Sequence, residues 1–421
     1  MKYGLIGHPL GHSFSPELHS ILGNREYELA DILPEDLESF FAKREFRGIN
    51  VTIPYKKDVI RFLDDISDEA GMIGSVNTIL NRNGRLFGYN TDAFGLETLI
   101  SKVSTDGLKN KNVLILGTGG SSLTAEYVAQ RQGAISVKKL SRNPAQENEI
   151  GADELKDVAG DTDFIINCTP VGMFPDTSGI PYDVNPRMFP RLSGVVDLIY
   201  NPLRTRLTFG FSDQGIRTVN GLLMLCAQAY KAHELFTDST PSVSVNELYS
   251  VVNSSKTNIV LIGMPSCGKS SVGKAIAEIT GRPYVDCDIE IEKRAGIKIR
   301  HIFEKYGEDS FRGIESDVIA DICAGANGLI IASGGGAVKL SENVFNLKKN
   351  GIVIYIDRST DKLISTPDRP LSKDKSTIEN LYRERRDMYL CAADVTVDGN
   401  GTVDETARAI ISRLEENGYA I

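Results

Sequence analysis

The stretch IVLIGMPSCGKS, residues 259–270, decides the fold of the C-terminal part of the chain. Its first four residues are apolar and predict a buried strand, and residues 263–270 match the pattern G-x-x-x-x-G-K-[ST]. Residues 271–280 favour a helix. In this order a glycine-rich loop wraps its N–H groups around phosphates, the lysine reaches the outer phosphates, and the serine hydroxyl can ligate Mg²⁺. We therefore predict a nucleotide-phosphate site, rather than a chance glycine turn, formed by Gly263, Gly268, Lys269, Ser270 and Ser271.

The whole chain has 421 residues, of which 41% are hydrophobic and 24% charged. Short apolar runs alternate with amphipathic stretches, which predicts an α/β fold with more than one domain. A formal net charge of −9 argues against nucleic acid or an anionic membrane as a partner. The six cysteines form no C-x-x-C pair, and neither a signal peptide nor a membrane span is recognisable, so we expect a cytoplasmic protein.

The polar stretch SVVNSSKTN at residues 250–258 contains few helix-forming residues. We expect a linker at residues 250–257 and a separate domain at residues 258–421.

Further polar clusters follow the phosphate loop. Asp286 and Asp288 stand two residues apart at the end of a predicted strand, so we expect both carboxylates on one side, one near metal-bound water and one accepting a substrate proton. Arg312 and Arg385 lie on predicted helices, and Arg369 precedes a proline in a polar loop. Taken singly, the acidic pair fits a solvated turn and each arginine fits a surface residue.

Together the motifs GMPSCGKS, VDCD, FRGIE, SGGGAV, RPL and ERRDMY resemble the shikimate kinase family. The resemblance implies a P-loop domain with a parallel sheet that transfers phosphate from ATP to shikimate with Mg²⁺. It implies that Arg312 and Arg385 hold the substrate carboxylate, which suits the guanidinium geometry. It implies that Asp288 orients the attacking hydroxyl group of the substrate and that Asp286 supports Mg²⁺ through a water molecule. It also implies that the substrate is flanked by Gly334, Gly335 and Gly336, and that Arg369 closes on the phosphates; Arg369 is the only basic residue of the short lid, residues 365–371.

A second glycine-rich loop, GTGGSS at residues 117–122, follows a predicted buried strand and opens a helix. It matches the dinucleotide pattern G-x-G-x-x-G imperfectly, because Ser122 replaces the third glycine, and alone it fits a simple turn equally well. The next strand ends in Ser141 and Arg142 instead of the acidic residue typical of NAD sites. Since an arginine suits a 2′-phosphate, we predict NADPH. Lys138 and Lys139 also fit a solvated basic turn.

Polar clusters near strand ends complete the N-terminal part. Together with INCTPVGM and GLLMLCAQA, they are similar to the shikimate dehydrogenase family. The resemblance implies that Ser13 and Ser15 bind the substrate carboxylate and that Lys56 and Asp92 form the catalytic pair. It implies substrate contacts from Thr52, Asn77, Tyr200 and Gln228. Cofactor contacts are implied for Gly117, Thr118, Gly119, Gly120, Ser121, Ser141, Arg142, Asn167, Thr169 and Gly221.

This resemblance implies a substrate lobe formed by residues 1–104 and 220–249, and a Rossmann-like NADP lobe at residues 105–219. The two reactions would be consecutive steps of the shikimate pathway. A lysine held by a carboxylate can relay the proton that ketone reduction needs. Lys56 and Asp92 also fit an ordinary surface ion pair.

Several alternatives remain at this stage. The dehydrogenase could be of the quinate type, or one half could be a non-catalytic regulatory module. A metal site at His8, His12 and His19 is rejected, because Pro9 and Pro16 interrupt the helix that would align them. The sequence leaves open whether the protein is a monomer or a homodimer.

Overall fold

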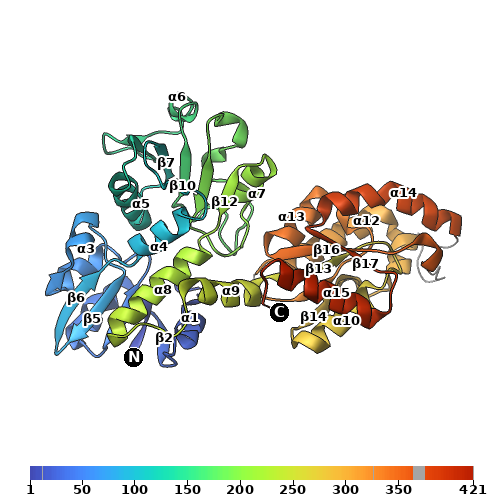
Figure 1. Ribbon diagram of the computed structural model, residues 1–421, viewed down its shortest axis with the longest axis horizontal. Coiled ribbons are helices and arrows are strands. Elements are labelled where there is room, and N and C mark those ends of the chain that lie inside the picture. Colours follow the sequence, from blue (N-terminus) through green and yellow to red (C-terminus); the bar gives the residue numbers. More distant parts are fainter. Residues whose placement is uncertain (12, 326, 364–374, 421) are drawn as a thin grey trace. The chain divides into compact units, whose positions relative to one another are not determined.

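The computed structural model describes residues 1–421 except 12, 326, 364–374 and 421. It divides into two compact units (Figure 1). The first comprises residues 1–200 and 205–249, and the second comprises residues 201–204 and 250–421. The mixed α/β class with parallel sheets predicted from the sequence is confirmed.

The first unit begins with a six-stranded sheet in the order β2-β1-β3-β5-β6-β4. The strands β5 and β6 form the predicted hairpin, in which Asn83 and Gly84 have φ angles of 54° and 84°. Both turn residues therefore adopt the left-handed conformation that an Asn-Gly pair tolerates. The strands are β1 (Tyr3–Gly7), β2 (Tyr27–Asp31), β3 (Gly48–Val51), β4 (Asp65–Ile66), β5 (Thr78–Arg82) and β6 (Arg85–Tyr89).

A second sheet of the first unit is wholly parallel, in the order β12-β11-β10-β7-β8-β9. Its strands are β7 (Asn112–Leu116), β8 (Ser136–Leu140), β9 (Glu149–Ile150), β10 (Phe164–Asn167), β11 (Gly194–Asp197) and β12 (Arg217–Val219). Side chains of the central strands are buried in separate hydrophobic clusters. This near-continuous apolar character is what a parallel sheet covered on both faces requires.

The helices α4 (Asp92–Ile100) and α8 (Leu222–Thr237) pack closely against each other in the first unit (Figure 1). A Cβ atom at Gly95 would lie 2.7 Å from the Met224 carbonyl oxygen, so the glycine permits this approach. The other helices of this unit are α1 (Ser15–Ile21), α2 (Leu37–Lys43), α3 (Asp68–Ile73), α5 (Gly120–Arg131), α6 (Leu155–Ala159) and α7 (Arg206–Asp213).

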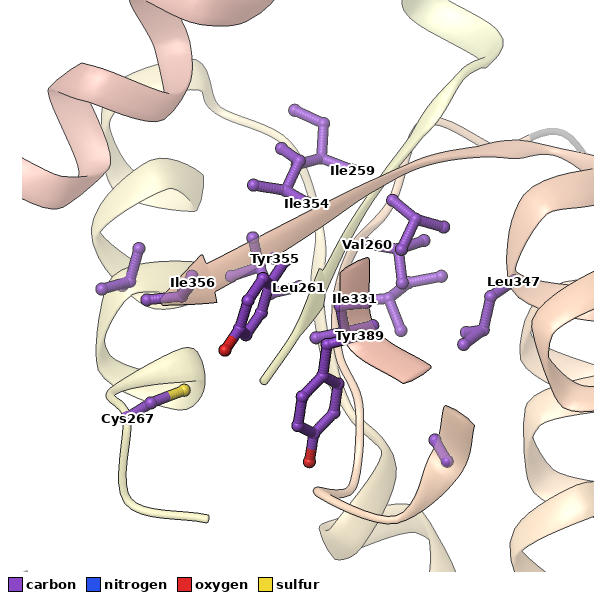
Figure 2. Packing of buried hydrophobic residues seen from close by; sticks show 14 of the residues in the cluster. Ile259, Val260, Leu261, Cys267, Ile331, Leu347, Ile354, Tyr355, Ile356 and Tyr389 are labelled. Atoms are coloured by element: carbon purple, nitrogen blue, oxygen red, sulfur yellow. The ribbon is translucent and has the colours of Figure 1, made fainter. Parts of the chain in front are cut away.

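The second unit contains a parallel sheet in the order β14-β15-β13-β16-β17. Its strands are β13 (Asn258–Ile262), β14 (Tyr284–Asp286), β15 (Ile330–Ala332), β16 (Gly351–Asp357) and β17 (Val395–Asp398). Its helices are α10 (Lys269–Thr280), α11 (Cys287–Ala295), α12 (Ile299–Ile322), α13 (Ser341–Lys349), α14 (Lys375–Ala392) and α15 (Val403–Glu416). Figure 2 shows residues of β13, β15 and β16 packed in the core, where the rings of Tyr355 and Tyr389 stack with centroids 5.2 Å apart.

The expectation of a helix-poor linker at residues 250–257 is wrong. Most of that stretch belongs to the helix α9 (Val245–Lys256). Ser244 and Glu247 cap each other reciprocally: the Ser244 N–H donates to Glu247 Oε2 at 2.7 Å, and the Glu247 N–H donates to Ser244 Oγ at 3.2 Å. Leu248 and Val252, four residues apart, are both fully buried, and this apolar face outweighs the polar composition.

No helix within the described ranges is both long and apolar enough to span a membrane.

Candidate active sites

The centre of the first site is a cation–carboxylate pair. Lys56 lies after the end of β3, and Asp92 is the first residue of α4. Lys56 Nζ lies 2.6 Å from Asp92 Oδ2, and the two side chains are only 13% and 8% exposed. The alternative of an ordinary surface ion pair is therefore wrong, because both groups are largely removed from water.

The glycine-rich loop of the second sheet reaches this pair. A Cβ atom at Gly120 would lie 3.7 Å from the Lys56 Cβ atom. The beginning of α5, where N–H groups attract phosphates, therefore lies directly against the predicted catalytic lysine. The structure thus brings the predicted cofactor loop and the predicted catalytic pair together.

Hydroxyl groups form a second cluster of predicted substrate residues. Ser13 Oγ donates a hydrogen bond to Ser15 Oγ at 3.1 Å, and the Ser15 N–H donates to Ser13 Oγ at 3.2 Å. Tyr200 is half-buried and hydrogen-bonded to Ser13, and desolvation raises the pKa of its phenol above the ordinary value. The ring of Phe14 packs on Tyr200 with centroids 5.2 Å apart. Three hydroxyl groups that can serve a carboxylate therefore meet at the start of α1.

A buried amide network lies immediately before Asp92. Asn77 Nδ2 donates to Thr91 Oγ1 at 3.0 Å, and the Thr91 N–H donates to Asn77 Oδ1 at 2.7 Å. Asn50 Nδ2 donates to Thr78 Oγ1 at 3.0 Å in the same region. Sequence reasoning missed the positioning roles of Asn50, Thr78 and Thr91, although their polarity at strand ends was a signal.

Two further predicted substrate residues lie on elements around the pair. Thr52 follows β3, and its N–H donates to the Ile6 carbonyl at 2.9 Å. Gln228 lies on α8, is 8% exposed, and donates from Nε2 to the Leu225 carbonyl at 2.9 Å. Their contacts with a substrate stay a prediction.

Glycines allow close backbone packing in and beside the cofactor loop, whereas a Cβ atom at Gly119 would meet no atom within 4 Å. Gly117 has a φ of 98°, and a Cβ atom there would lie 2.9 Å from the Thr169 methyl group. At Gly221 a Cβ atom would lie 2.1 Å from the Leu198 carbonyl oxygen. Ser122, which interrupts the glycine pattern, is buried and donates to the Gly119 carbonyl at 2.6 Å. The serine that replaces the third glycine therefore stabilises the loop through this hydrogen bond. Thr118 and Ser121 lie in the same turn.

A buried carboxylate supports the neighbouring strand ends. Asn167 Oδ1 accepts hydrogen bonds from the Thr169 N–H at 3.0 Å and hydroxyl at 2.8 Å, and Asn167 Nδ2 donates to Asp197 at 2.9 Å. Burial raises the pKa of Asp197 to about 6, although hydrogen bonds from Thr205, the Ile199 N–H and Asn167 oppose the increase. Sequence reasoning missed Asp197; an acid that ends an apolar strand was the available signal.

The predicted 2′-phosphate residues follow β8. Ser141 is buried and its hydroxyl accepts from the Asn143 N–H at 3.2 Å, whereas Arg142 is exposed. Lys139 is only 2% exposed and pairs with Glu126 at 2.9 Å and Glu149 at 3.6 Å. Lys139 is therefore a buried ion-pair residue and not part of a solvated turn.

The second site is a pocket of about 710 Å³ in the second unit. Its lining unites the residues predicted from separate motifs, namely Gly268, Lys269, Ser270, Ser271, Asp288, Arg312, Gly334, Gly335, Gly336 and Arg385. Lys269 is 8% exposed, and its Nζ donates to the carbonyls of Gly263 at 3.0 Å and Met264 at 2.9 Å.

The two aspartates do not share a strand as expected. Asp286 ends β14, but Asp288 lies in the first turn of α11, because the Asp286 side chain accepts the Asp288 N–H at 3.0 Å and caps the helix. Asp286 Oδ2 also accepts from Ser270 Oγ at 2.7 Å. Asp288 Oδ1 lies 3.1 Å from where a Cβ atom of Gly334 would be, so this carboxylate faces the glycine turn.

The two arginines reach the pocket by different means. Arg312 Nη1 lies 2.6 Å from Glu315 Oε2, and its Nη2 lies 3.0 Å from Glu308 Oε1. A Cβ atom at Gly336 would overlap the Arg312 guanidinium, so a larger residue there would require the arginine to shift. Arg385 is 2% exposed, and its Nη1 donates to the Gly335 carbonyl at 3.2 Å.

Sequence reasoning also missed Glu315 in this pocket. Its side chain is 1% exposed, and burial raises the pKa of its carboxyl above the ordinary value while Arg312 opposes the increase. The signal was its position three residues after Arg312 on a helix. The predicted lid residue Arg369 lies outside the described residues.

Comparison with known proteins agrees with this geometry. The family model for the shikimate dehydrogenase substrate binding domain matches residues 5–79, and the model for shikimate kinase matches residues 265–415. A shikimate dehydrogenase (NADP(+)) from Halothermothrix orenii is 36% identical over 280 residues, covering 59% of this chain and 95% of the relative. One from Methanococcus maripaludis is 36% identical and covers 58% and 93%.

Solved structures extend the comparison. Shikimate dehydrogenase 1 from Peptoclostridium difficile has 37% identity and a TM-score of 0.53, covering 59% of this chain and 98% of that one. A chorismate mutase/shikimate 5-dehydrogenase fusion protein from Clostridium acetobutylicum has 34% identity and a TM-score of 0.54, covering 59% and 95%.

Proposed function

Because the chain belongs to the shikimate dehydrogenase family and carries a shikimate kinase domain, we propose that it performs two consecutive reactions. The first is the NADPH-dependent reduction of 3-dehydroshikimate to shikimate. The second is the ATP-dependent phosphorylation of shikimate to shikimate 3-phosphate. The observation that carries the proposal is the largely buried Lys56–Asp92 pair, which lies against the cofactor loop.

In the dehydrogenase, Lys56 donates the proton that the ketone oxygen needs when the ring carbon receives hydride. Asp92, 2.6 Å away, holds the lysine oriented at that oxygen. Ser13, Ser15 and Tyr200 bind the substrate carboxylate, with contributions to ring binding from Thr52, Asn77 and Gln228. Low exposure of the pair strengthens its electrostatic effect on the developing alkoxide.

The fit of NADPH is supported by the open space at Gly119 of the loop, where a Cβ atom would meet no atom within 4 Å. Arg142 and Ser141 would hold the 2′-phosphate, and Asn167 and Thr169 would lie along the cofactor. When bound, NADPH supplies the hydride.

In the kinase, Asp288 accepts the proton of the attacking hydroxyl group, and Arg312 and Arg385 hold the carboxylate of shikimate. Lys269 neutralises charge on the transferred phosphoryl group. The oxygens of Ser270 and Asp286, 2.7 Å apart, are hard donors of the type that Mg²⁺ prefers. When bound, Mg²⁺ neutralises phosphate charge, and Asp286 would support it through water.

The test is a coupled assay on the full chain. With 3-dehydroshikimate, NADPH and ATP, we expect shikimate to form and then to be converted into shikimate 3-phosphate, with ADP formed in equal amount. Quinate with NADP⁺ serves as the comparison substrate. If the chain binds ADP but does not phosphorylate added shikimate, the second unit is a regulatory module. If the chain oxidises quinate faster than shikimate, the first unit is a quinate-type dehydrogenase.

We place both reactions in the cytoplasm, which is supported by six cysteines that are all free thiols. The proposal requires no macromolecular partner and holds equally for a monomer and for a homodimer.

A further inference from the structure

Arg358 follows the last residue of β16 and reaches the phosphate loop. Its Nη1 atom lies 3.7 Å from the position that a Cβ atom of Gly268 would occupy. Its Nε atom is buried, yet it has no hydrogen-bond partner within the described part of the chain. Since buried polar groups are nearly always paired, an unpaired guanidinium nitrogen beside a phosphate-binding loop calls for an explanation.

The backbone around Arg358 is held firmly. The Gly399 N–H donates to the Asp357 carbonyl at 2.7 Å, and the Ser359 N–H donates to Asn400 Oδ1 at 3.0 Å. These bonds attach both neighbours of Arg358 to the turn that follows β17. The first carbon of the side chain lies close to this turn, since a Cβ atom at Gly399 would lie 3.5 Å from the Arg358 Cβ atom.

The end of β16 also touches the other end of the phosphate loop. A Cβ atom at Gly263 would lie 2.8 Å from the Ile356 carbonyl oxygen and 2.9 Å from Cys267 Sγ. In Figure 2, Ile356 and Cys267 lie at this junction. Arg358 therefore directly follows a strand whose end lies against Gly263, while its own guanidinium lies near Gly268.

The nearest carboxylate in sequence is already engaged elsewhere. Asp357 Oδ1 accepts hydrogen bonds from the hydroxyl groups of Tyr355 at 2.9 Å and Tyr382 at 3.3 Å. In the described residues Arg358 takes part in no ion pair, whereas Arg312 in the same unit is paired with two glutamates. The positive charge of Arg358 therefore stays available beside the loop.

We propose that Arg358 binds a phosphate oxygen of the nucleotide held by residues 263–270. This inference rests on the proposed kinase site and adds a second cation to Lys269. A guanidinium donates charge-assisted hydrogen bonds in a fork that matches phosphate geometry. From its position by Gly268, Arg358 approaches the phosphates from outside the loop, while Lys269 approaches them from within.

The proposal is tested with Arg358→Gln and the charge-retaining Arg358→Lys in the full chain. Binding of ADP, inorganic tripolyphosphate and adenosine is measured by titration calorimetry with saturating NADP⁺, which occupies the dinucleotide lobe. We expect Arg358→Gln to weaken ADP and tripolyphosphate about tenfold or more, to leave adenosine and shikimate binding unchanged, and Arg358→Lys to lie between. The control is Arg413→Gln, which removes an exposed arginine of α15 paired with Glu416 at 3.0 Å.

Unchanged ADP affinity in Arg358→Gln overturns the proposal. Weaker adenosine with unchanged tripolyphosphate also overturns it, because the arginine would then contact the base. If both variants lose shikimate binding and melt at lower temperature without nucleotide, Arg358 is a structural residue and the proposal fails. A wild-type chain that binds ADP through Arg358 but does not phosphorylate shikimate would refute the proposed kinase function alone.

Discussion

His19 provides a quantitative prediction for the stability of the first unit. This residue of α1 is fully buried and stacks on the ring of Tyr27 with centroids 3.9 Å apart. The pKa of His19 is lowered from 6.5 to about 3, chiefly by burial and also by repulsion from His233, while the nearby Asn50 side chain partly opposes the decrease. Between about pH 6.5 and pH 3 the imidazole is therefore neutral in the folded protein but protonated in the unfolded chain.

The sign of the effect follows from proton binding. Between pH 6.5 and pH 3 the unfolded chain binds more protons at His19 than the folded chain, so folding stability falls as pH falls through this window. Above pH 6.5 the stability contribution is fully present. At pH 5, about 1.5 pH units below the ordinary pKa, the loss is about 2 kcal/mol at roughly 1.4 kcal/mol per unit. The loss at pH 5 is nearly the same for any folded-state pKa below about 4.

The substitution His19→Phe removes the titration but keeps an aromatic ring against Tyr27. For a unit of this size, about 2 kcal/mol corresponds to roughly 4–8 °C in Tm. Calorimetry at pH 7 and pH 5 can follow the first unit through the transition that NADP⁺ shifts upward. We expect the acid-induced drop in Tm to be smaller in His19→Phe by roughly 4–8 °C.

A matched control is His8→Gln, which removes a partly exposed histidine paired with Asp31 at 2.7 Å. Removing His8 should not reduce the drop. If His19→Phe loses as much Tm between pH 7 and pH 5 as the wild type, the reasoning about the buried neutral imidazole is refuted.

Three further predictions concern the sites. Lys56→Ala should lower dehydrogenase turnover by roughly 10²–10⁴ and leave the kinase unchanged, because the proposed proton donor belongs to the first unit alone; an equal loss in both separate assays would indicate misfolding instead. Arg142→Ala should raise the KM for NADPH about tenfold more than that for NADH, since only NADPH carries the 2′-phosphate; an unchanged ratio would remove Arg142 from the cofactor site. Asp288→Asn should abolish phosphorylation while calorimetry still detects ATP binding, and near-normal turnover would contradict its role in orienting the hydroxyl group.

The sequence predicted correctly those elements whose geometry depends on residues adjacent in the chain. The phosphate loop lies between β13 and α10 as expected, and the Asn83–Gly84 turn joins β5 to β6. In both cases a few consecutive residues determine the backbone conformation. Local signals of this kind also identified the separate motifs that meet in the pocket of the second unit.

Other features depend on contacts that composition does not reveal. The helix α9 was missed because its composition is polar, although Leu248 and Val252 are buried in the folded chain. Asp288 was placed on a strand because the capping role of Asp286, which starts α11 one residue later, was not considered. The buried carboxylates of Asp197 and Glu315 were missed because an acidic residue is normally exposed unless a partner compensates its burial, and the partners come from the folded chain.

The two sites share a physical solution to the problem of holding a cation ready for an anionic substrate. Lys56 is paired with Asp92, and Arg312 with Glu315, in each case at 2.6 Å and with both side chains at most 13% exposed. Such a pair contributes little net stability, because desolvation offsets much of the attraction, but loss of one partner leaves a buried charge uncompensated. The carboxylate therefore fixes the cation in place before the substrate arrives, and less reorganisation is needed when charge develops during the reaction. This explains why Asp92 and Glu315 are buried beside Lys56 and Arg312, the cations that we propose contact the substrate.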